Sequence, residues 1–214
     1  MDIEKGSQVI DALNIADLSV SRGDRRLFHK LFLDVRAGEA VALTGGNGAG
    51  KTSLLRAIAG FIRPDGGQID FVSNSVRLEA DEARRQGLHL LGHLEGLKPA
   101  RTALQELSFQ CRYLGGNESQ MAKAIEDFQL APLLDLETRR LSAGQRRRLS
   151  LARLVSAPRP LWLLDEPLAP LDSVWRQRAG EQMQAHLAAG GMIIAAVHDP
   201  LPFAARAFDL GGFA

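Results

Sequence analysis

The chain has 214 residues, of which 45% are apolar and 24% charged, and its formal net charge is +1, a balance typical of one large globular domain. This charge excludes a global field that attracts nucleic acid or an anionic membrane, and a single cysteine, Cys111, excludes a disulfide framework. No apolar run reaches the ~18–20 residues that span a bilayer, and residues 1–8 lack the basic and apolar regions of a signal peptide. We therefore expect a cytoplasmic protein that meets a membrane only through a partner.

Hydrophobic periodicity and turn residues predict strands that alternate with helices along most of the chain. Strands are expected at 10–20, 31–36, 41–43, 69–72, 88–93, 161–166, 191–198 and about 207–211, with the polar turn SRGDRR between the first two. Helices are expected at 51–59, 101–114, 118–130, 142–156 and 173–189. This alternation predicts an α/β sheet, into which a mostly helical block is inserted.

The stretch TGGNGAGKTS at 44–53 matches the phosphate-binding pattern G-x-x-x-x-G-K-[ST]. An expected strand precedes it and an expected helix follows, which is the context that phosphate binding needs. Glycines let backbone N–H groups wrap the phosphates, and the helix N-terminus adds partial positive charge. Lys51 would then reach the β- and γ-phosphates, and Thr52 would bind Mg²⁺. The expected nucleotide-binding residues are Gly45, Gly46, Asn47, Gly48, Ala49, Gly50, Lys51, Thr52 and Ser53.

The segment LWLLDE at 161–166 predicts a buried strand that ends in two acids. Many buried strands end in acids, so the pair alone indicates little. A phosphate-binding loop upstream makes it the expected second half of a nucleotide site. Asp165 is expected to hold Mg²⁺, and Glu166 is expected to orient and deprotonate the attacking water.

The segment LSAGQ at 141–145 predicts, on its own, only a capping box with Ser142 at the N-cap and Gln145 at N3. A helix start that contains a bare glycine, Gly144, is also a second anion site. The segment begins 24 residues before Asp165 (165 − 141). This order and spacing, after a phosphate-binding loop, resemble the signature of ABC-type ATPases.

The resemblance extends over nearly the whole chain and implies the fold and the remaining site residues. It implies a P-loop NTPase with a mainly parallel core sheet, N-terminal antiparallel strands and a helical insertion. The domain would span 8–214, with core parts at 8–93 and 157–214 and the insertion at 94–156. Asp172 resembles the family's aspartate at the subunit contact, and His198 resembles its γ-phosphate-sensing histidine.

In this family the nucleotide lies between the phosphate-binding loop of one subunit and the signature of another, so the resemblance implies a homodimer around two MgATP. Arg146, Arg147 and Arg148 follow the signature on the same helix. We expect them to form a solvated face near bound phosphate, the alternative being a nucleic-acid patch.

Two departures from the common family pattern narrow the resemblance. Arg22 stands where most members have an aromatic residue that stacks on adenine; a guanidinium can also stack on a base. His93 stands where most have a glutamine near Mg²⁺, although it could also be an ordinary loop histidine. The run LGHLEGLKPARTALQEL resembles the ATP-binding subunits of the heme exporter of cytochrome c biogenesis.

This resemblance implies an ATP-hydrolysing subunit, peripheral on the cytoplasmic face of a bacterial inner membrane. Its partners would be an integral membrane permease and other cytochrome c maturation proteins, with no nucleic acid. It leaves open whether ATP moves heme itself or releases a heme-loaded chaperone. A soluble ABC ATPase of iron–sulfur-type cofactor assembly, or a transporter ATPase for another substrate, shares every motif. A P-loop kinase does not explain LSAGQ or the pair Asp165 and Glu166. A nucleic-acid ABC ATPase of the repair or chromosome type would carry long coiled coils or duplicated cassettes, whereas this sequence has one cassette, no heptads and no basic face.

Overall fold

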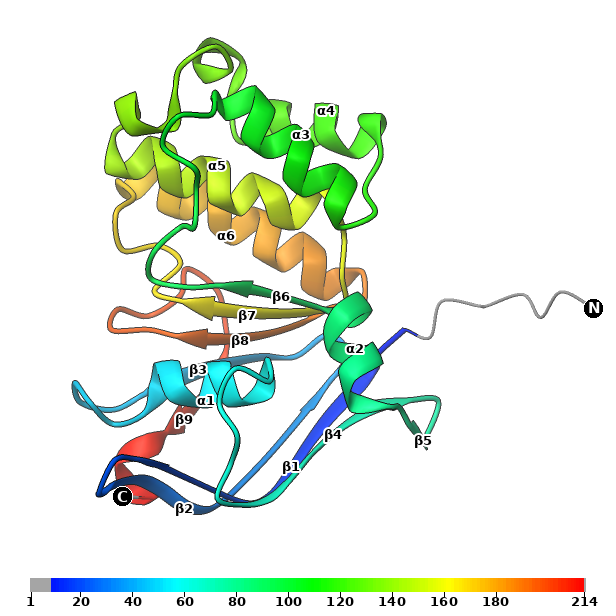
Figure 1. Cartoon of the computed structure of the whole chain (residues 1–214), viewed down its shortest axis with the longest axis vertical. Coiled ribbons are helices and arrows are strands. Elements are labelled where there is room, and N and C mark those ends of the chain that lie inside the picture. The colour runs from blue at the N-terminus through cyan, green and yellow to red at the C-terminus, as the bar shows by residue number, and fades with distance from the viewer. Residues whose placement is uncertain (1–8, 214) are drawn as a thin grey trace, which may run out of the picture.

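The computed structural model describes residues 9–213, which form two β-sheets with helix α1 (Lys51–Ile58) packed between them (Figure 1). The first sheet is antiparallel, with the order β2-β1-β4-β5. Its strands are β1 (Ala12–Arg22), β2 (Arg25–Arg36), β4 (Gly66–Ser73) and β5 (Val76–Arg77). These are the expected N-terminal antiparallel strands.

The second sheet is parallel and has the order β6-β7-β8-β3-β9. Its strands are β3 (Ala40–Thr44), β6 (Leu88–Leu91), β7 (Leu161–Asp165), β8 (Met192–Ala196) and β9 (Arg206–Asp209). β7 and β8 are buried at every position, as strands covered on both faces must be. The carboxyl ends of these strands meet at one edge of the sheet, so the loops that follow β3, β6, β7 and β8 lie near one another.

Helices cover the upper face of the parallel sheet in Figure 1, while α1 covers the lower face. The upper helices are α3 (Ala103–Tyr113), α4 (Glu118–Asp127), α5 (Ala143–Ser156) and α6 (Ser173–Ala188). Single 3-10 turns lie at Ala131–Leu133, Thr138–Arg140 and Leu210–Phe213. No helix within residues 9–213 has both the length and the apolar character needed to cross a bilayer.

Side-chain alternation along the parallel strands divides the interior into two cores. In β7, Leu161 and Leu163 join the core shared with α1 and the antiparallel sheet, whereas Trp162 and Leu164 join the core beneath the upper helices. Because side chains alternate with period two, each strand serves both cores. This arrangement confirms the expected α/β class with a P-loop NTPase sheet. The boundaries at 8–93, 94–156 and 157–214 stay a prediction, and residues 8 and 214 lie outside the described part.

Several expected element limits were wrong. The second strand begins at Arg25 rather than at residue 31, because the turn takes only Gly23 and Asp24 and the exposed residues Arg25 and Arg26 already belong to the strand. The helix expected to run to residue 130 ends at Asp127, and Gln129 has a φ of 46°, which a continuing helix does not allow.

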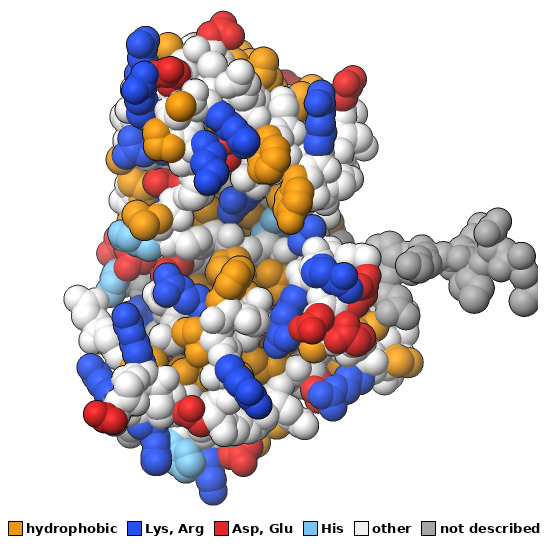
Figure 2. Space-filling view, in the orientation of Figure 1, with side chains coloured by type: hydrophobic (Ala, Val, Ile, Leu, Met, Phe, Trp, Pro, Cys, Tyr) orange, Lys and Arg blue, Asp and Glu red, His pale blue; other side chains and the backbone are white. Residues whose placement is uncertain are grey.

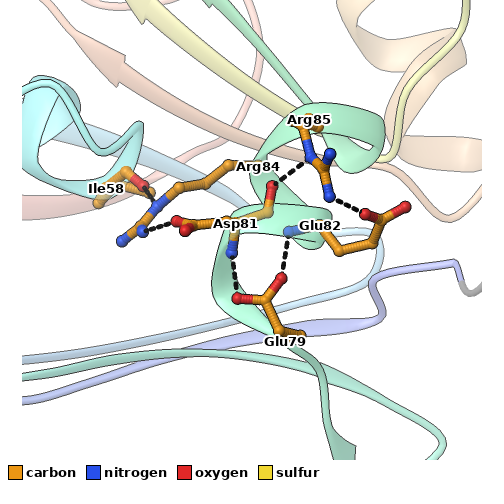
Figure 3. Close-up of polar contacts among 6 residues, drawn as sticks. All are labelled: Ile58, Glu79, Asp81, Glu82, Arg84 and Arg85. Carbon is orange, nitrogen blue, oxygen red and sulfur yellow. Dashed lines mark hydrogen bonds and ion pairs between the residues drawn. The ribbon is translucent and has the colours of Figure 1, made fainter.

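Helix α2 (Ala80–Gly87) was not expected, because its N-cap is a glutamate instead of Ser, Thr, Asp or Asn. The Glu79 carboxylate accepts hydrogen bonds from the N–H groups of Asp81 at 3.0 Å and Glu82 at 2.7 Å (Figure 3). These backbone donors hold the pKa of Glu79 below its ordinary value. Arg84 Nε donates to the carbonyl of Ile58 at 3.1 Å, which ties α2 to the end of α1.

Candidate functional site

The glycine loop between β3 and α1 turns in a way that only glycine accommodates without strain. Gly45, Gly48 and Gly50 have φ values of 120°, 81° and 98°. A Cβ added at Gly50 would lie 3.1 Å from Cδ1 of Phe28, so the loop also packs closely on β2. Helix α1 begins at Lys51 with no side-chain cap and no acid in its first turn. Its first N–H groups are therefore free to bind an anion.

Lys51 is only 8% exposed, and its ammonium group lies inside the loop. Nζ donates to the carbonyls of Gly45 at 2.6 Å and Gly46 at 3.3 Å. A buried ammonium held by two carbonyls and no carboxylate leaves positive charge unbalanced within the loop. The loop is therefore a cationic cradle that suits phosphate oxygens.

Thr52 and Asp165 meet at the base of this cradle, although 113 positions separate them in the sequence. Thr52 Oγ1 donates to Asp165 Oδ2 at 2.9 Å, and Asp165 is 5% exposed at the carboxyl end of β7. A hydroxyl and a carboxylate are hard oxygen ligands, which is the donor chemistry that Mg²⁺ prefers. The pair fits a magnesium ion on the phosphate side of the cleft.

Glu166 follows directly after β7, and two histidines converge on its carboxylate. His198 Nε2 lies 3.0 Å from Glu166 Oε1, and His93 Nδ1 lies 3.7 Å from Oε2. His198 comes after β8 and His93 after β6, so three neighbouring strand ends supply the three side chains. In Figure 2, histidine and acidic side chains gather at the left edge, below the helical layer. The structure thus brings together the expected Glu166, His198 and His93.

A cleft of about 280 Å³ connects Glu166 and His198 to the glycine loop. Its lining comprises Asn47 to Ser53, Asp165, Glu166 and His198, together with Leu27 and two arginines, Arg22 and Arg25. Arg22 was expected here, but Arg25 was not. A Cβ added at Gly48 would lie 3.5 Å from Arg25 Nη1, so this guanidinium lies against the loop. Its place in an arginine-rich turn carried no signal that distinguished it from its neighbours.

The signature residues lie elsewhere. Ser142 and Gln145 form the expected capping box, with Ser142 Oγ accepting from Gln145 N at 3.2 Å and Gln145 Oε1 accepting from Ser142 N at 2.8 Å. Asp172 caps α6 by accepting from Trp175 N at 2.9 Å. Among the described residues that line the cleft, Ser142, Gly144, Gln145 and Asp172 are absent.

The three arginines after the signature do not form one solvated face, so that expectation was wrong for Arg147, while Arg146 and Arg148 are half-buried. Arg147 is 1% exposed and donates to backbone carbonyls. The guanidinium of Arg148 lies 4.1 Å from the ring centroid of Trp175, in cation–π geometry. Arg146 donates to the carbonyl of Leu141 at 2.6 Å. Each of the three side chains contacts other residues of the same chain, and these contacts could not be predicted from three adjacent arginines in the sequence.

A glycine loop between a parallel strand and a helix, with an acidic strand end opposite, defines a P-loop nucleotide-binding domain. The profile of the ABC transporter family matches residues 28–169. The chain is 47% identical over 193 residues to the cytochrome c biogenesis ATP-binding export protein CcmA of Rhodopseudomonas palustris strain BisB5, covering 90% of this chain and 94% of that protein. The protein of the same name from Maricaulis maris is 40% identical over 202 residues, covering 94% and 92%.

Solved structures agree on the fold. A putative ABC transporter ATP-binding protein from Pyrococcus furiosus superimposes with a TM-score of 0.82 at 22% identity, covering 95% of this chain and 99% of that one. A dimeric ATP-binding cassette bound to ADP and Pi gives a TM-score of 0.75 at 20% identity, covering 87% and 88%. The chain therefore belongs to the ABC transporter family, as an ATP-binding cassette of the CcmA type.

Proposed function

We propose that this chain hydrolyses ATP and drives a membrane export complex of cytochrome c biogenesis, with heme as the cargo. The names of its 40–47% identical relatives support the export role. One observation carries the chemistry: Glu166 contacts His198 and His93 at the mouth of a cleft that also holds Lys51. A carboxylate oriented from both sides beside a phosphate cradle suits the attack of water on a phosphate.

The phosphate-binding role rests on residues 45–53. The free N–H groups of the loop and of α1, together with Lys51, bind the β- and γ-phosphates. Thr52 and Asp165 hold Mg²⁺, which neutralises charge on the phosphate oxygens when bound. On nucleotide binding, the Lys51 ammonium exchanges its two carbonyl partners for phosphate oxygens, and Thr52 releases Asp165.

Hydrolysis uses the three side chains at the strand ends. Glu166 accepts a proton from the attacking water as the water oxygen bonds to the γ-phosphorus and the bond to the ADP oxygen breaks. His198, at 3.0 Å from Glu166, holds the carboxylate and contacts the γ-phosphate. His93, at 3.7 Å, approaches the same carboxylate from the loop after β6. Arg22, at the rim of the cleft, stacks on the base.

A second copy completes the site. Ser142, Gly144, Gln145 and Asp172 lie outside the cleft of their own chain, which supports their binding a nucleotide held by a partner. Gly144 lies in the first turn of α5, whose N-terminal N–H groups suit an anion. The homodimer forms around two ATP molecules, as a dimeric relative of the same fold suggests. Closure is driven by contacts that exist only in the closed state.

The proposed partner is an integral membrane permease, with other cytochrome c maturation membrane proteins nearby and no nucleic acid. The chain would lie peripherally on the cytoplasmic face of a bacterial inner membrane. In this role ATP either moves heme or releases a heme-loaded chaperone.

The test is to capture the tagged chain from detergent-solubilised native membranes and to identify what accompanies it by mass spectrometry. A small polytopic permease with heme-binding neighbours is expected. A permease for another substrate would remove heme from the proposal, and soluble partners alone would favour a cofactor-assembly ATPase. Lys51→Ala is the matched control: it should retain the same partners while ATP hydrolysis by the captured complex is lost.

A further inference from the structure

Arg147 lies in the second turn of α5 and is one of the largest fully buried side chains among residues 9–213. Its guanidinium joins two loops that follow different strands. Nη1 donates to the carbonyl of Gly92 at 3.2 Å, and Nη2 donates to the carbonyl of Glu166 at 3.2 Å and reaches that of His93 at 3.5 Å. The side chains of His93 and Glu166 contact each other, and the Arg147 guanidinium contacts the main-chain carbonyl of each.

The backbone at Glu166 is unusual and needs such support. Its φ is 48°, a left-handed conformation that costs a residue with a Cβ about 1 kcal/mol or more. The N–H of Glu166 donates to Ala196 O at 2.9 Å, at the end of β8. Its carbonyl accepts from Arg147. The residue is therefore held on both sides of its Cα, which directs the carboxylate towards His198.

Burial of the Arg147 guanidinium disfavours its charged form, but it lets one side chain contact two loops. Burial lowers the pKa of Arg147 below its ordinary value, while the carboxylates of Glu95, Asp165 and Glu166 act to raise it. The planar fork of a guanidinium directs two nitrogens at two different loops at once. A lysine offers one nitrogen in place of two, and a glutamine offers an amide on a shorter side chain, so each would keep only part of the contacts to the three carbonyls.

We propose that Arg147 is a positioning residue for ATP hydrolysis, which fixes the Glu166 and His93 loops relative to each other. The inference rests on the proposed function, because it requires Glu166 to act on the attacking water. Arg147 belongs to the helix that begins with LSAGQ, so it also links the signature end of α5 to the two loops. Arg147 does not line the nucleotide cleft, and it acts through Glu166 and His93.

The test compares Arg147→Gln and Arg147→Lys with Arg153→Gln in the purified full chain. Arg153 is the matched control, because it lies on the same helix and donates from Nη2 to the carbonyl of Leu90 at 3.1 Å, away from Glu166. We expect Arg147→Gln to lower kcat about 10- to 100-fold, the range that displacement of a reacting group produces. The KM for ATP and the affinity for a fluorescent ATP analogue should stay within about twofold, because the binding residues are untouched.

Arg147→Lys should give an intermediate kcat, and it keeps the test available if the glutamine variant does not fold. Arg153→Gln should retain kcat within about threefold at a similar urea midpoint. In a Glu166→Gln background, Arg147→Gln should cause no further loss of single-turnover rate, since both act through one carboxylate.

The inference is overturned if both Arg147 variants keep the kcat of the unmodified chain, or if Arg153→Gln lowers kcat as much. Failure of the proposed function looks different: the unmodified chain and its Glu166→Gln variant would then turn over MgATP at the same rate. If Glu166→Gln abolishes turnover while Arg147→Gln does not, only the positioning role is lost.

Discussion

The buried histidine His89 makes the stability of this protein depend on pH in a direction that the structure specifies. It lies on β6 with 3% of its surface exposed, and its Nε2 is 2.6 Å from the carbonyl of Ala157. A carbonyl only accepts, so Nε2 carries the proton and donates it in this hydrogen bond. Burial lowers the pKa of His89 to about 3, against the weaker opposing effect of that hydrogen bond.

The magnitude follows from proton linkage. In the unfolded chain the histidine pKa is about 6.5, so below that pH the unfolded state binds a proton that the folded state refuses. The stability due to neutral His89 is complete above pH ~6.5 and is lost as the pH falls from ~6.5 towards the folded pKa. Between pH 8 and pH 5 the loss is 2.303RT × ~1.5, or about 2 kcal/mol. His186, whose pKa is lowered to about 4 by burial, acts in the same direction.

Urea unfolding at pH 8, 6.5 and 5 measures this effect, with tryptophan fluorescence as the probe. Trp162 stacks on His186 with 3.9 Å between ring centroids, so one of the two tryptophans reports on this region directly. His89→Gln keeps an amide donor but does not titrate, and should lose about 2 kcal/mol less stability between pH 8 and pH 5 than the unmodified chain. His29→Gln, at an exposed site on β2, is the control and should leave the loss of stability between pH 8 and pH 5 as it is in the unmodified chain. An identical pH slope in His89→Gln and the unmodified chain would refute the reasoning.

Three further predictions concern the nucleotide site. Gly50→Ala should destabilise the chain by about 1–3 kcal/mol in urea unfolding, because a φ of 98° and the 3.1 Å approach to Phe28 both oppose a Cβ; an unchanged midpoint would contradict this. With Arg22 at the base position, the chain should hydrolyse GTP within a few-fold of ATP, and Arg22→Ala should raise KM for both; a steep loss with GTP counts against that role. Glu166→Gln should accumulate as a dimer in MgATP, seen by light scattering after gel filtration, whereas a persistent monomer would argue against the sandwich.

The nucleotide loop could be predicted from sequence because its constraints are local. The loop contains three glycines with positive φ, one lysine and one threonine within a few residues of one another. A local sequence pattern is therefore enough to predict its backbone geometry. The capping box at Ser142 and Gln145 is local in the same sense, since its two hydrogen bonds span three positions. The acidic end of β7 can also be recognised in the sequence, because Asp165 and Glu166 directly follow a run of apolar residues.

Other parts of the site depend on packing between distant segments. Helix α2 was not predicted because its N-cap is a glutamate, which is not one of the residue types that usually mark a helix start. The sequence does not show what His93 lies next to, whereas the strand order β6-β7-β8 brings its loop beside Glu166 and His198. The adjacency of these strands is a property of the sheet and not of any one segment.

The class of protein could be predicted from the sequence, and the glycine loop, the acidic pair and the LSAGQ segment could be located in it, because each is formed by residues close together along the chain. The tertiary structure decided which charges are buried. In a run of three arginines every position looks equally solvated, yet Arg147 is enclosed while its neighbours lie against Leu141 and Trp175. Burial depends on which elements pack against a helix, and those elements come from β6 and β7, 19 to 55 positions away. That long-range packing placed a guanidinium where the two loops meet.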